Sequence, residues 1–342
     1  MSTERPGVLD GALHPAENNR LFGHTEAEHF LAQGYRSGKG HHAILIEGPE
    51  GIGKATLAFR FANHILSHPE PELAPAELAD PDPSSIVSRQ ITAGASHNLL
   101  HLTRPVDEKT RRVKGAITVD EVRRAGKFFS QTSGTGNWRI VIIDPADDLN
   151  RNAANAILKI LEEPPKRSLF LVLTHAPGKL LPTIRSRCLP LKLKPLPDEA
   201  LRMALGHLGF EDSTNDAVIS AAGGSVSEAL KLINYGGLDI KAAFENIVTG
   251  EGTGRRSEMH KLADVLSGKD SETIYDFFVE IAGNHVIGAA RQAALCGDII
   301  RAERLARLSS SLTEKLTIAE AYNLDRKQSI LSLLEELKVA TA

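Results

Sequence analysis

A glycine-rich turn between an apolar segment and a helical pattern limits the folds open to this chain more than any other feature. The turn follows the apolar run at 43–47 and reads Gly48-Pro49-Glu50-Gly51-Ile52-Gly53-Lys54. Glycines allow successive backbone N–H groups to surround an anion, and the amino end of a helix adds partial positive charge. The order of strand, glycine turn, lysine and helix predicts a phosphate-binding P-loop. The alternative is a purely structural strand-to-helix turn.

Strand-like and helix-like segments alternate through the first half of the chain. Besides 43–47, strands are expected at 98–103, 139–143 and 169–173. The last two are continuously apolar, which is typical of parallel strands buried on both faces. Asn150 predicts the N-cap of the helix between them. The sequence therefore predicts an α/β fold with a parallel sheet covered by helices.

Helical patterns dominate after Pro190. The segment at 191–197, LKLKPLP, is interpreted as a linker, and no internal repeat is evident. We expect a P-loop domain at 1–195, a small helical domain at 196–240 and a C-terminal helical domain at 241–342.

The composition of the 342 residues excludes several classes of protein. Two cysteines, Cys188 and Cys296, exclude a disulfide framework and a cysteine-based zinc site. No apolar run approaches the roughly 18 residues that span a membrane, and the N-terminus lacks the core of a secretory signal. We therefore expect a cytoplasmic protein with no membrane partner. The net charge of −3 provides no long-range attraction to nucleic acid, so the basic runs at 109–114 and 255–256 are either solvated loops or local DNA contacts.

The candidate nucleotide site lacks residues that hydrolysis requires. The position after Lys54 holds Ala55, whose methyl group cannot bind Mg²⁺, and Thr56 is expected to point elsewhere because it lies about 100° further round the helix. Asp144 ends the strand at 139–143, where it could hold the Mg²⁺ shell, but Pro145 follows instead of an acid that orients water. The degenerate site comprises Gly48, Pro49, Glu50, Gly51, Ile52, Gly53, Lys54, Ala55, Thr56 and Asp144. We expect poor ATP hydrolysis, with Asp147 or Asp148 as less favoured substitute bases.

The order of GPEGIGKAT, VIID, AILKILEEPP, LFLVLTH and SRC resembles the AAA+ module of the clamp-loader subunits of bacterial DNA polymerase III. The similarity covers residues 20–200 closely and the helical remainder only in layout. It implies an AAA+ sheet, a helical lid and a C-terminal collar. It also implies that Arg187 is an arginine finger inserted into the ATP site of a neighbouring subunit, since guanidinium is always charged and forks onto phosphate oxygens. The alternative is that Arg187 makes only a structural ion pair.

Departures from the family pattern point to its non-motor end subunit. The motor subunit γ/τ is expected to keep the P-loop hydroxyl, an Asp-Glu pair and a sensor arginine, where this chain has Ser227. Ser225 and Glu228 around it are interpreted as a capping box. The resemblance implies a hetero-pentamer with γ/τ and δ, within the DNA polymerase III holoenzyme, that loads the sliding clamp at primer–template DNA. ATP or ADP is expected to bind weakly or not at all. No metal site is expected, because the stretch at 68–98, where many relatives carry a zinc module, has no cysteine.

Two other functions remain open at this point. One is an active γ/τ-like ATPase that uses Thr56 and a nearby acid in unusual roles. The other is a P-loop nucleotide-binding regulator outside replication. ATP turnover by the isolated chain would identify the first, and failure to capture γ/τ and δ would favour the second.

Overall fold

The computed structural model describes residues 8–107, 113–130, 136–249, 255–268, 271–322 and 324–341. The chain forms two compact units, Met1–Leu230 and Lys231–Ala342. The predicted division into domains at 1–195, 196–240 and 241–342 stays a prediction. Of the two basic runs, Lys109, Arg111 and Arg112 lie outside the described residues, as does the side chain of Arg255.

The first unit is built on a parallel sheet in the order β2-β3-β4-β1-β5. Its strands are β1 (Ala43–Glu47), β2 (Leu99–Leu102), β3 (Arg139–Ile143), β4 (Ser168–Thr174) and β5 (Leu189–Lys192). Every residue of β1, β3 and β4 is buried, as their apolar sequences predict for strands covered on both faces. The predicted α/β fold with a parallel sheet is confirmed.

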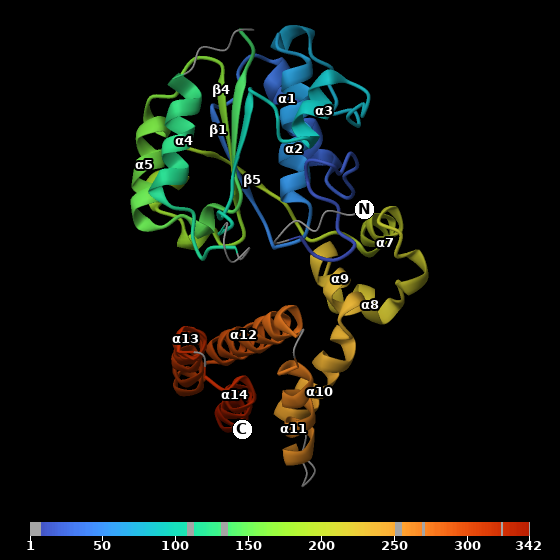
Figure 1. The fold of residues 1–342 in the computed structure, drawn as a ribbon, viewed down its shortest axis with the longest axis vertical. Coiled ribbons are helices and arrows are strands. Elements are labelled where there is room, and N and C mark those ends of the chain that lie inside the picture. Colours follow the sequence, from blue (N-terminus) through green and yellow to red (C-terminus); the bar gives the residue numbers. More distant parts are fainter. Residues whose placement is uncertain are drawn as a thin grey trace. The chain divides into compact units, whose positions relative to one another are not determined.

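Helices cover both faces of this sheet (Figure 1). One layer contains α1 (Thr25–Arg36), α2 (Lys54–Ser67) and α3 (Ile86–Thr92); the other contains α4 (Val119–Ser130) and α5 (Arg151–Glu162). The apolar stripe of α2 is buried, with Leu57, Phe61 and Ile65 at most 3% exposed. Asn150 caps α5, since its side-chain oxygen accepts the N–H of Ala153 at 2.9 Å. The local signals in the sequence thus correctly located both helices.

The interpretation of residues 191–197 as a linker is wrong for its first residues. Strand β5 extends to Lys192 and pairs in parallel with β1, with Ile44 opposite Leu189 and Glu47 opposite Lys192. It lies at the edge of the sheet, where the missing N–H of Pro190 leaves no interior ladder bond unmade. A short edge strand with proline and lysine therefore has the composition of a linker.

Short helices complete the first unit. They are α6 (Pro182–Arg185) before β5, followed by α7 (Asp198–His207), α8 (Asp216–Ala222) and the first residues of α9 (Val226–Asn234). Short 3-10 turns lie at Pro71–Leu73, Ala146–Asp148, Pro177–Lys179 and Glu211–Ser213. The segment at 68–85, which contains five prolines, holds only the first of these turns.

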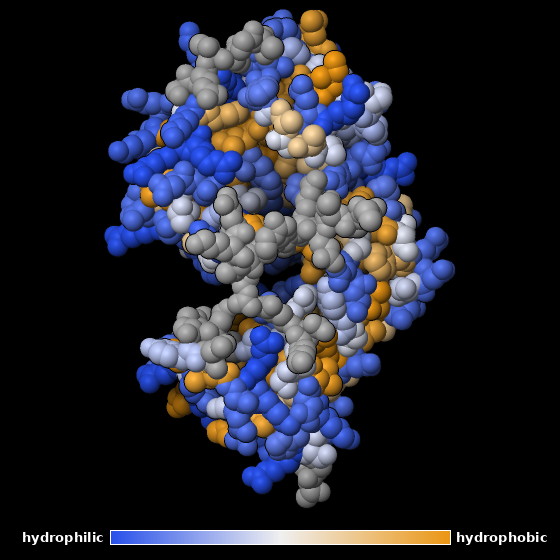
Figure 2. Space-filling view, viewed as in Figure 1, coloured by the Kyte–Doolittle hydropathy of each residue, from blue (hydrophilic) through white to orange (hydrophobic). Residues whose placement is uncertain are grey.

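The second unit is helical. Its helices are α10 (Gly237–Thr249), α11 (Arg255–Leu266), α12 (Glu272–Leu295), α13 (Ile299–Ala321) and α14 (Arg326–Thr341). Phe244, Phe278 and Leu334 lie in its core, where Leu305 and Leu312 of α13 join them. On the face shown in Figure 2, hydrophobic residues are interspersed among hydrophilic ones. None of the helices in the described ranges is long and apolar enough to cross a membrane.

Candidate functional site

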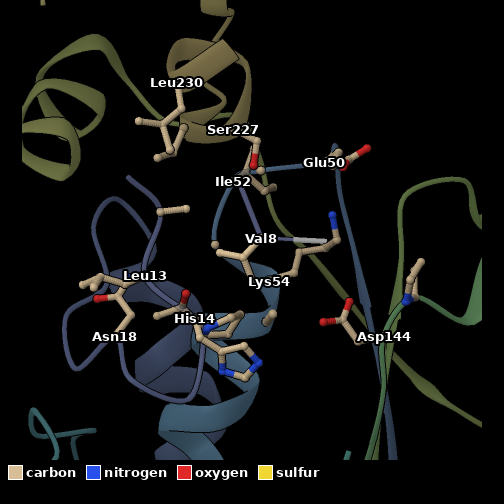
Figure 3. A pocket seen from close by; sticks show the side chains of 18 of the residues that line it. Val8, Leu13, His14, Asn18, Glu50, Ile52, Lys54, Asp144, Ser227 and Leu230 are labelled. Carbon is tan, nitrogen blue, oxygen red and sulfur yellow. The ribbon is translucent and has the colours of Figure 1, made fainter. Parts of the chain in front are cut away.

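A cavity of about 690 Å³ lies in the first unit beside the P-loop. Figure 3 shows Lys54 and Asp144 on its wall, together with Ser227 and Leu230 of α9 and His14 of the N-terminal segment. Of the residues predicted for the nucleotide site, the cavity brings together Glu50, Gly51, Ile52, Gly53, Lys54, Ala55, Thr56 and Asp144. Gly48 and Pro49 do not line it but bind Lys54 through their carbonyl groups. The predicted residues therefore form one site.

The backbone of the P-loop explains its glycines. Gly51 has φ of +72° and Gly53, the N-cap of α2, has φ of +100°. Both values lie in the left-handed region, which glycine adopts without the strain that a side chain would introduce. Helix α2 begins at Lys54 with its amino end at the cavity, in the arrangement that suits a phosphate.

Lys54 is directed into the loop. Its side chain is buried, and Nζ donates to the carbonyl oxygen of Gly48 at 2.7 Å and to that of Pro49. Burial lowers the pKa of Lys54 to about 8, although Asp144 and Glu50 act to raise it. A phosphate would therefore compete with two backbone carbonyls for this ammonium group.

The site offers fewer groups for binding Mg²⁺ than for binding a phosphate. Asp144 contributes a carboxylate, but it lies 3.4 Å from Nε2 of His101, and Ala55 and Pro145 offer no side-chain oxygen. Thr56 is also among the residues that line the cavity, since the first turn of α2 runs along it. That the Thr56 hydroxyl points away from the site stays a prediction. Within the described residues, no group of three or more His, Cys, Asp or Glu side chains could hold a metal ion. The site fits a phosphate better than hydrated Mg²⁺.

The acidic residues after Pro145 have structural partners. The Asp147 carboxylate accepts hydrogen bonds from Thr174 Oγ1 at 2.8 Å and from the backbone N–H groups of His175 and Ala176. Asp148 pairs with Arg104 at 3.0 Å, and burial raises its pKa while Arg104 opposes that shift. Both carboxylates hold the chain near the carboxyl ends of β2 and β4, which disfavours either as a substitute base.

Sequence reasoning missed two residues that reach the cavity from these strand ends. Arg104 follows β2, and His175 follows β4. Burial lowers the pKa of His175, as does Lys54, and its Nδ1 atom has no hydrogen-bond partner in the described chain. Their position directly after a predicted strand could have identified them, because ligand sites in parallel sheets lie beyond the carboxyl ends of the strands.

The amino end of α9 binds the P-loop directly. Ser225 Oγ donates to the Glu50 carbonyl at 2.9 Å, and the Val226 N–H donates to the Gly51 carbonyl at 2.9 Å. Ser225 also accepts the N–H of Glu228 at 3.2 Å, which confirms the serine half of the predicted capping box. The loop is thus held by backbone and serine contacts at the place where a sensor arginine was expected in a motor subunit.

Gly51→Ala is expected to break this contact. A Cβ at Gly51 would lie 2.4 Å from Ser225 Oγ and 2.6 Å from Ser227 Cβ, at a φ unfavourable for alanine. The overpacking should lower the free energy of unfolding by about 1–3 kcal/mol beyond the backbone strain. Gly38→Ala is the matched control, since its φ is +67° but nothing lies within 4 Å. Urea unfolding of both variants, with hydrogen exchange at 225–228, tests this; equal losses would contradict it.

Arg187 lies at the opposite end of the sheet from the P-loop. It precedes β5, whose Leu189 pairs with Ile44 near the start of β1, whereas the P-loop follows the end of β1 at Glu47. Five residues of strand separate the two ends by about 16 Å. Arg187 therefore lies away from the chain's own phosphate loop, and its guanidinium pairs with Glu162 at the end of α5. The role of Arg187 in a neighbouring site stays a prediction.

Comparisons with known proteins identify sequence similarity to subunits of DNA polymerase III. The sequence profile of the family described as "DNA polymerase III, delta subunit" matches residues 23–197, about half of the chain. DNA polymerase III subunit delta′ of Pseudomonas aeruginosa is 34% identical over 198 residues, covering 57% of this chain and 56% of the relative. Subunit tau of Escherichia coli is 28% identical over 273 residues, covering 78% of this chain and 39% of the relative.

These matches are partial for the relatives as well as for the chain. The delta′ subunit of Escherichia coli is 30% identical over 207 residues, which cover 59% of this chain and 57% of the relative. The chain thus spans little more than half the length of the delta′ relatives and less of tau. A solved gamma subunit-related protein from Thermotoga maritima aligns with 93% of this chain and 99% of its own, at a TM-score of 0.44 and 16% identity.

Proposed function

Because the chain belongs to the family of the DNA polymerase III delta subunit, we propose that it is a non-motor clamp-loader subunit of the delta′ type. The observation that carries the proposal is the division of the site into an intact phosphate part and a deficient metal part. The glycine turn and Lys54 survive, but Ala55 and Pro145 stand where a Mg²⁺ ligand and a water-orienting acid are needed.

Arg187 gives the subunit a part in ATP hydrolysis at a neighbouring site, although its own site is deficient. It acts as an arginine finger in trans, because the fold places it at the far end of β1 from the chain's own P-loop. Its guanidinium stabilises the charge that develops on phosphate oxygens in the ATP site of a neighbouring γ/τ subunit. The subunit works in a hetero-pentamer with γ/τ and δ that loads the sliding clamp on primer–template DNA in the cytoplasm.

An active γ/τ-like motor is the second candidate. Two observations favour it: the tau relative matches a larger share of this chain than the delta′ relatives do, and Thr56 reaches the cavity wall. A motor would need Thr56 to bind Mg²⁺ and a residue other than Pro145 to orient water.

Measurements with and without Mg²⁺ distinguish the non-motor subunit from the motor. We expect nucleotide binding by the isolated chain to be weak or absent, and any ADP affinity to be the same in EDTA as in Mg²⁺, because Ala55 and Pro145 offer the metal no side-chain oxygen. Steady-state ATP hydrolysis should be indistinguishable between the wild type and Lys54→Ala. Calorimetric titration in both buffers and a phosphate-release assay measure these quantities. Binding tightened by Mg²⁺, together with turnover that Lys54→Ala abolishes, would identify a motor.

A further inference from the structure

The guanidinium group of Arg187 is held from two helices. Nη2 donates to Glu162 Oε1 at 2.6 Å, at the end of α5, and Nη1 donates to the Thr183 carbonyl at 2.9 Å, in α6. We propose that Glu162 is the positioning residue of the arginine finger and that, with Thr183, it fixes the guanidinium plane before the neighbouring phosphate arrives. This inference rests on the proposed function.

Both supports are anchored in the core. Leu161, next to Glu162, is 1% exposed, and its carbonyl accepts a hydrogen bond from His42 Nε2 at 3.1 Å. Ile184, next to Thr183, is also 1% exposed and lies in the same hydrophobic cluster as Leu161. The end of α5 and the short helix α6 therefore form a fixed platform, from which the carboxylate and the carbonyl reach one surface side chain.

The two contacts leave part of the guanidinium group for a ligand. Arginine has five N–H donors in a rigid plane, and these contacts use one on each terminal nitrogen. The remaining donors keep the fork that binds phosphate oxygens. Two fixed points reduce the rotations that a long side chain must lose when it engages a ligand, which is how supporting groups accelerate a reaction they do not touch.

The solvent exposure of Arg187 and Glu162 indicates that their ion pair contributes little to folding. The side chain of Arg187 is 33% exposed and that of Glu162 is 48% exposed. Water screens such pairs, so they contribute little to stability. Loss of Glu162 should therefore change the action of the arginine without changing the unfolding transition of the chain.

The test uses a clamp loader reconstituted with its γ/τ and δ partners and measures DNA-stimulated ATP hydrolysis. Glu162→Ala is expected to lower kcat at the site completed by Arg187 about tenfold, with the KM for ATP unchanged. Glu162→Gln, which keeps an oxygen that can accept from Nη2, should retain most of the rate. Glu163→Ala, a change at the exposed neighbouring position, is the control and should match the wild type. The loss of rate in Arg187→Ala is the reference with which the loss in Glu162→Ala is compared.

A double variant provides the decisive readout. If Glu162 acts through the arginine, Glu162→Ala should cause no further loss in the Arg187→Ala background. An additional loss there, or an unchanged or raised kcat in Glu162→Ala alone, would overturn the positioning role while leaving the finger itself in place. If Arg187→Ala has no effect, the proposed function fails, and this inference fails with it.

Discussion

Arg187→Ala is expected to reduce ATP hydrolysis on the order of 10³-fold at the one site that the proposed arginine finger completes in a reconstituted loader. In the proposed role, the guanidinium would stabilise charge that appears on phosphate oxygens only in the transition state, so kcat should fall with little change in nucleotide affinity. Pre-steady-state phosphate release, which distinguishes one silent site from the remaining active sites, measures the loss. Clamp loading on primed DNA should slow in parallel.

Arg185→Ala is the matched control for this prediction. Arg185 lies two residues away in the same turn and is exposed, so it shares the charge and the surroundings of Arg187. The control variant should hydrolyse ATP and load clamps as the wild type does. Arg187→Lys should recover little of the rate, because an ammonium group lacks the planar fork. Unchanged hydrolysis and loading in Arg187→Ala would remove the finger assignment.

Arg60→Leu is expected to destabilise the first unit by about 3–5 kcal/mol. The Arg60 side chain is only 4% exposed and binds Glu28 at 2.8 Å and Asp80 at 2.7 Å, besides the backbone carbonyls of Asn19 and Leu78. Helices α1 and α2 and the segment that contains Leu78 and Asp80 are joined through this one guanidinium. Its removal leaves the mostly buried carboxylate of Glu28 without its cation, which costs more than the pair contributes.

Arg20→Leu is the control, since Arg20 lies 4.0 Å from the same Asp80 but is 60% exposed. It should change the free energy of unfolding by less than about 1 kcal/mol. Urea unfolding of both variants makes the comparison, and a loss in Arg60→Leu no larger than that in Arg20→Leu would contradict the account. Replacing Glu28 as well should restore part of the stability.

The deficit in Arg60→Leu should also depend on pH. Burial raises the pKa of Glu28 above its ordinary value of 4.5, while Arg60 opposes that shift. Without Arg60, the pKa of Glu28 in the folded state should rise further, so the folded state keeps a proton that the unfolded state has released. The free energy of unfolding of Arg60→Leu then falls as pH rises from the ordinary pKa of Glu28 to its raised pKa in the folded variant. Unfolding at about pH 5 and about pH 8 should show the larger deficit at the higher pH.

Local sequence signals predicted the elements that depend on local chemistry. The apolar run at 43–47 and the glycines after it located β1, the P-loop and the start of α2, and Asn150 located the start of α5. Strand β5 was missed, because the pairing with β1 that makes it a strand comes from residues nearly 150 positions earlier in the chain. Pro190 and the neighbouring lysines read as a linker, since edge strands tolerate what interior strands exclude.

The candidate site was predictable only in part, for the same reason. The capping role of Ser225 could be read from Glu228, three residues away, but the hydroxyl also binds the Glu50 carbonyl across 175 positions. His175 lies next to a predicted strand without any motif of its own. The network of Arg60 joins segments that share no pattern in the sequence. The residue types at a motif show which chemical groups are missing. The contacts that hold the P-loop in place join distant parts of the sequence and depend on the fold.

The placement of the P-loop and Arg187 at opposite ends of β1 gives the molecule a polarity. In a head-to-tail row of such modules, each member meets one neighbour with its P-loop end and the other with its arginine end. A member whose arginine end is intact but whose P-loop end cannot hydrolyse ATP would interrupt the row of working sites if it stood in the middle. At the terminus it removes none, and it completes the last one. A module of this kind therefore sets where a row of ATP sites stops.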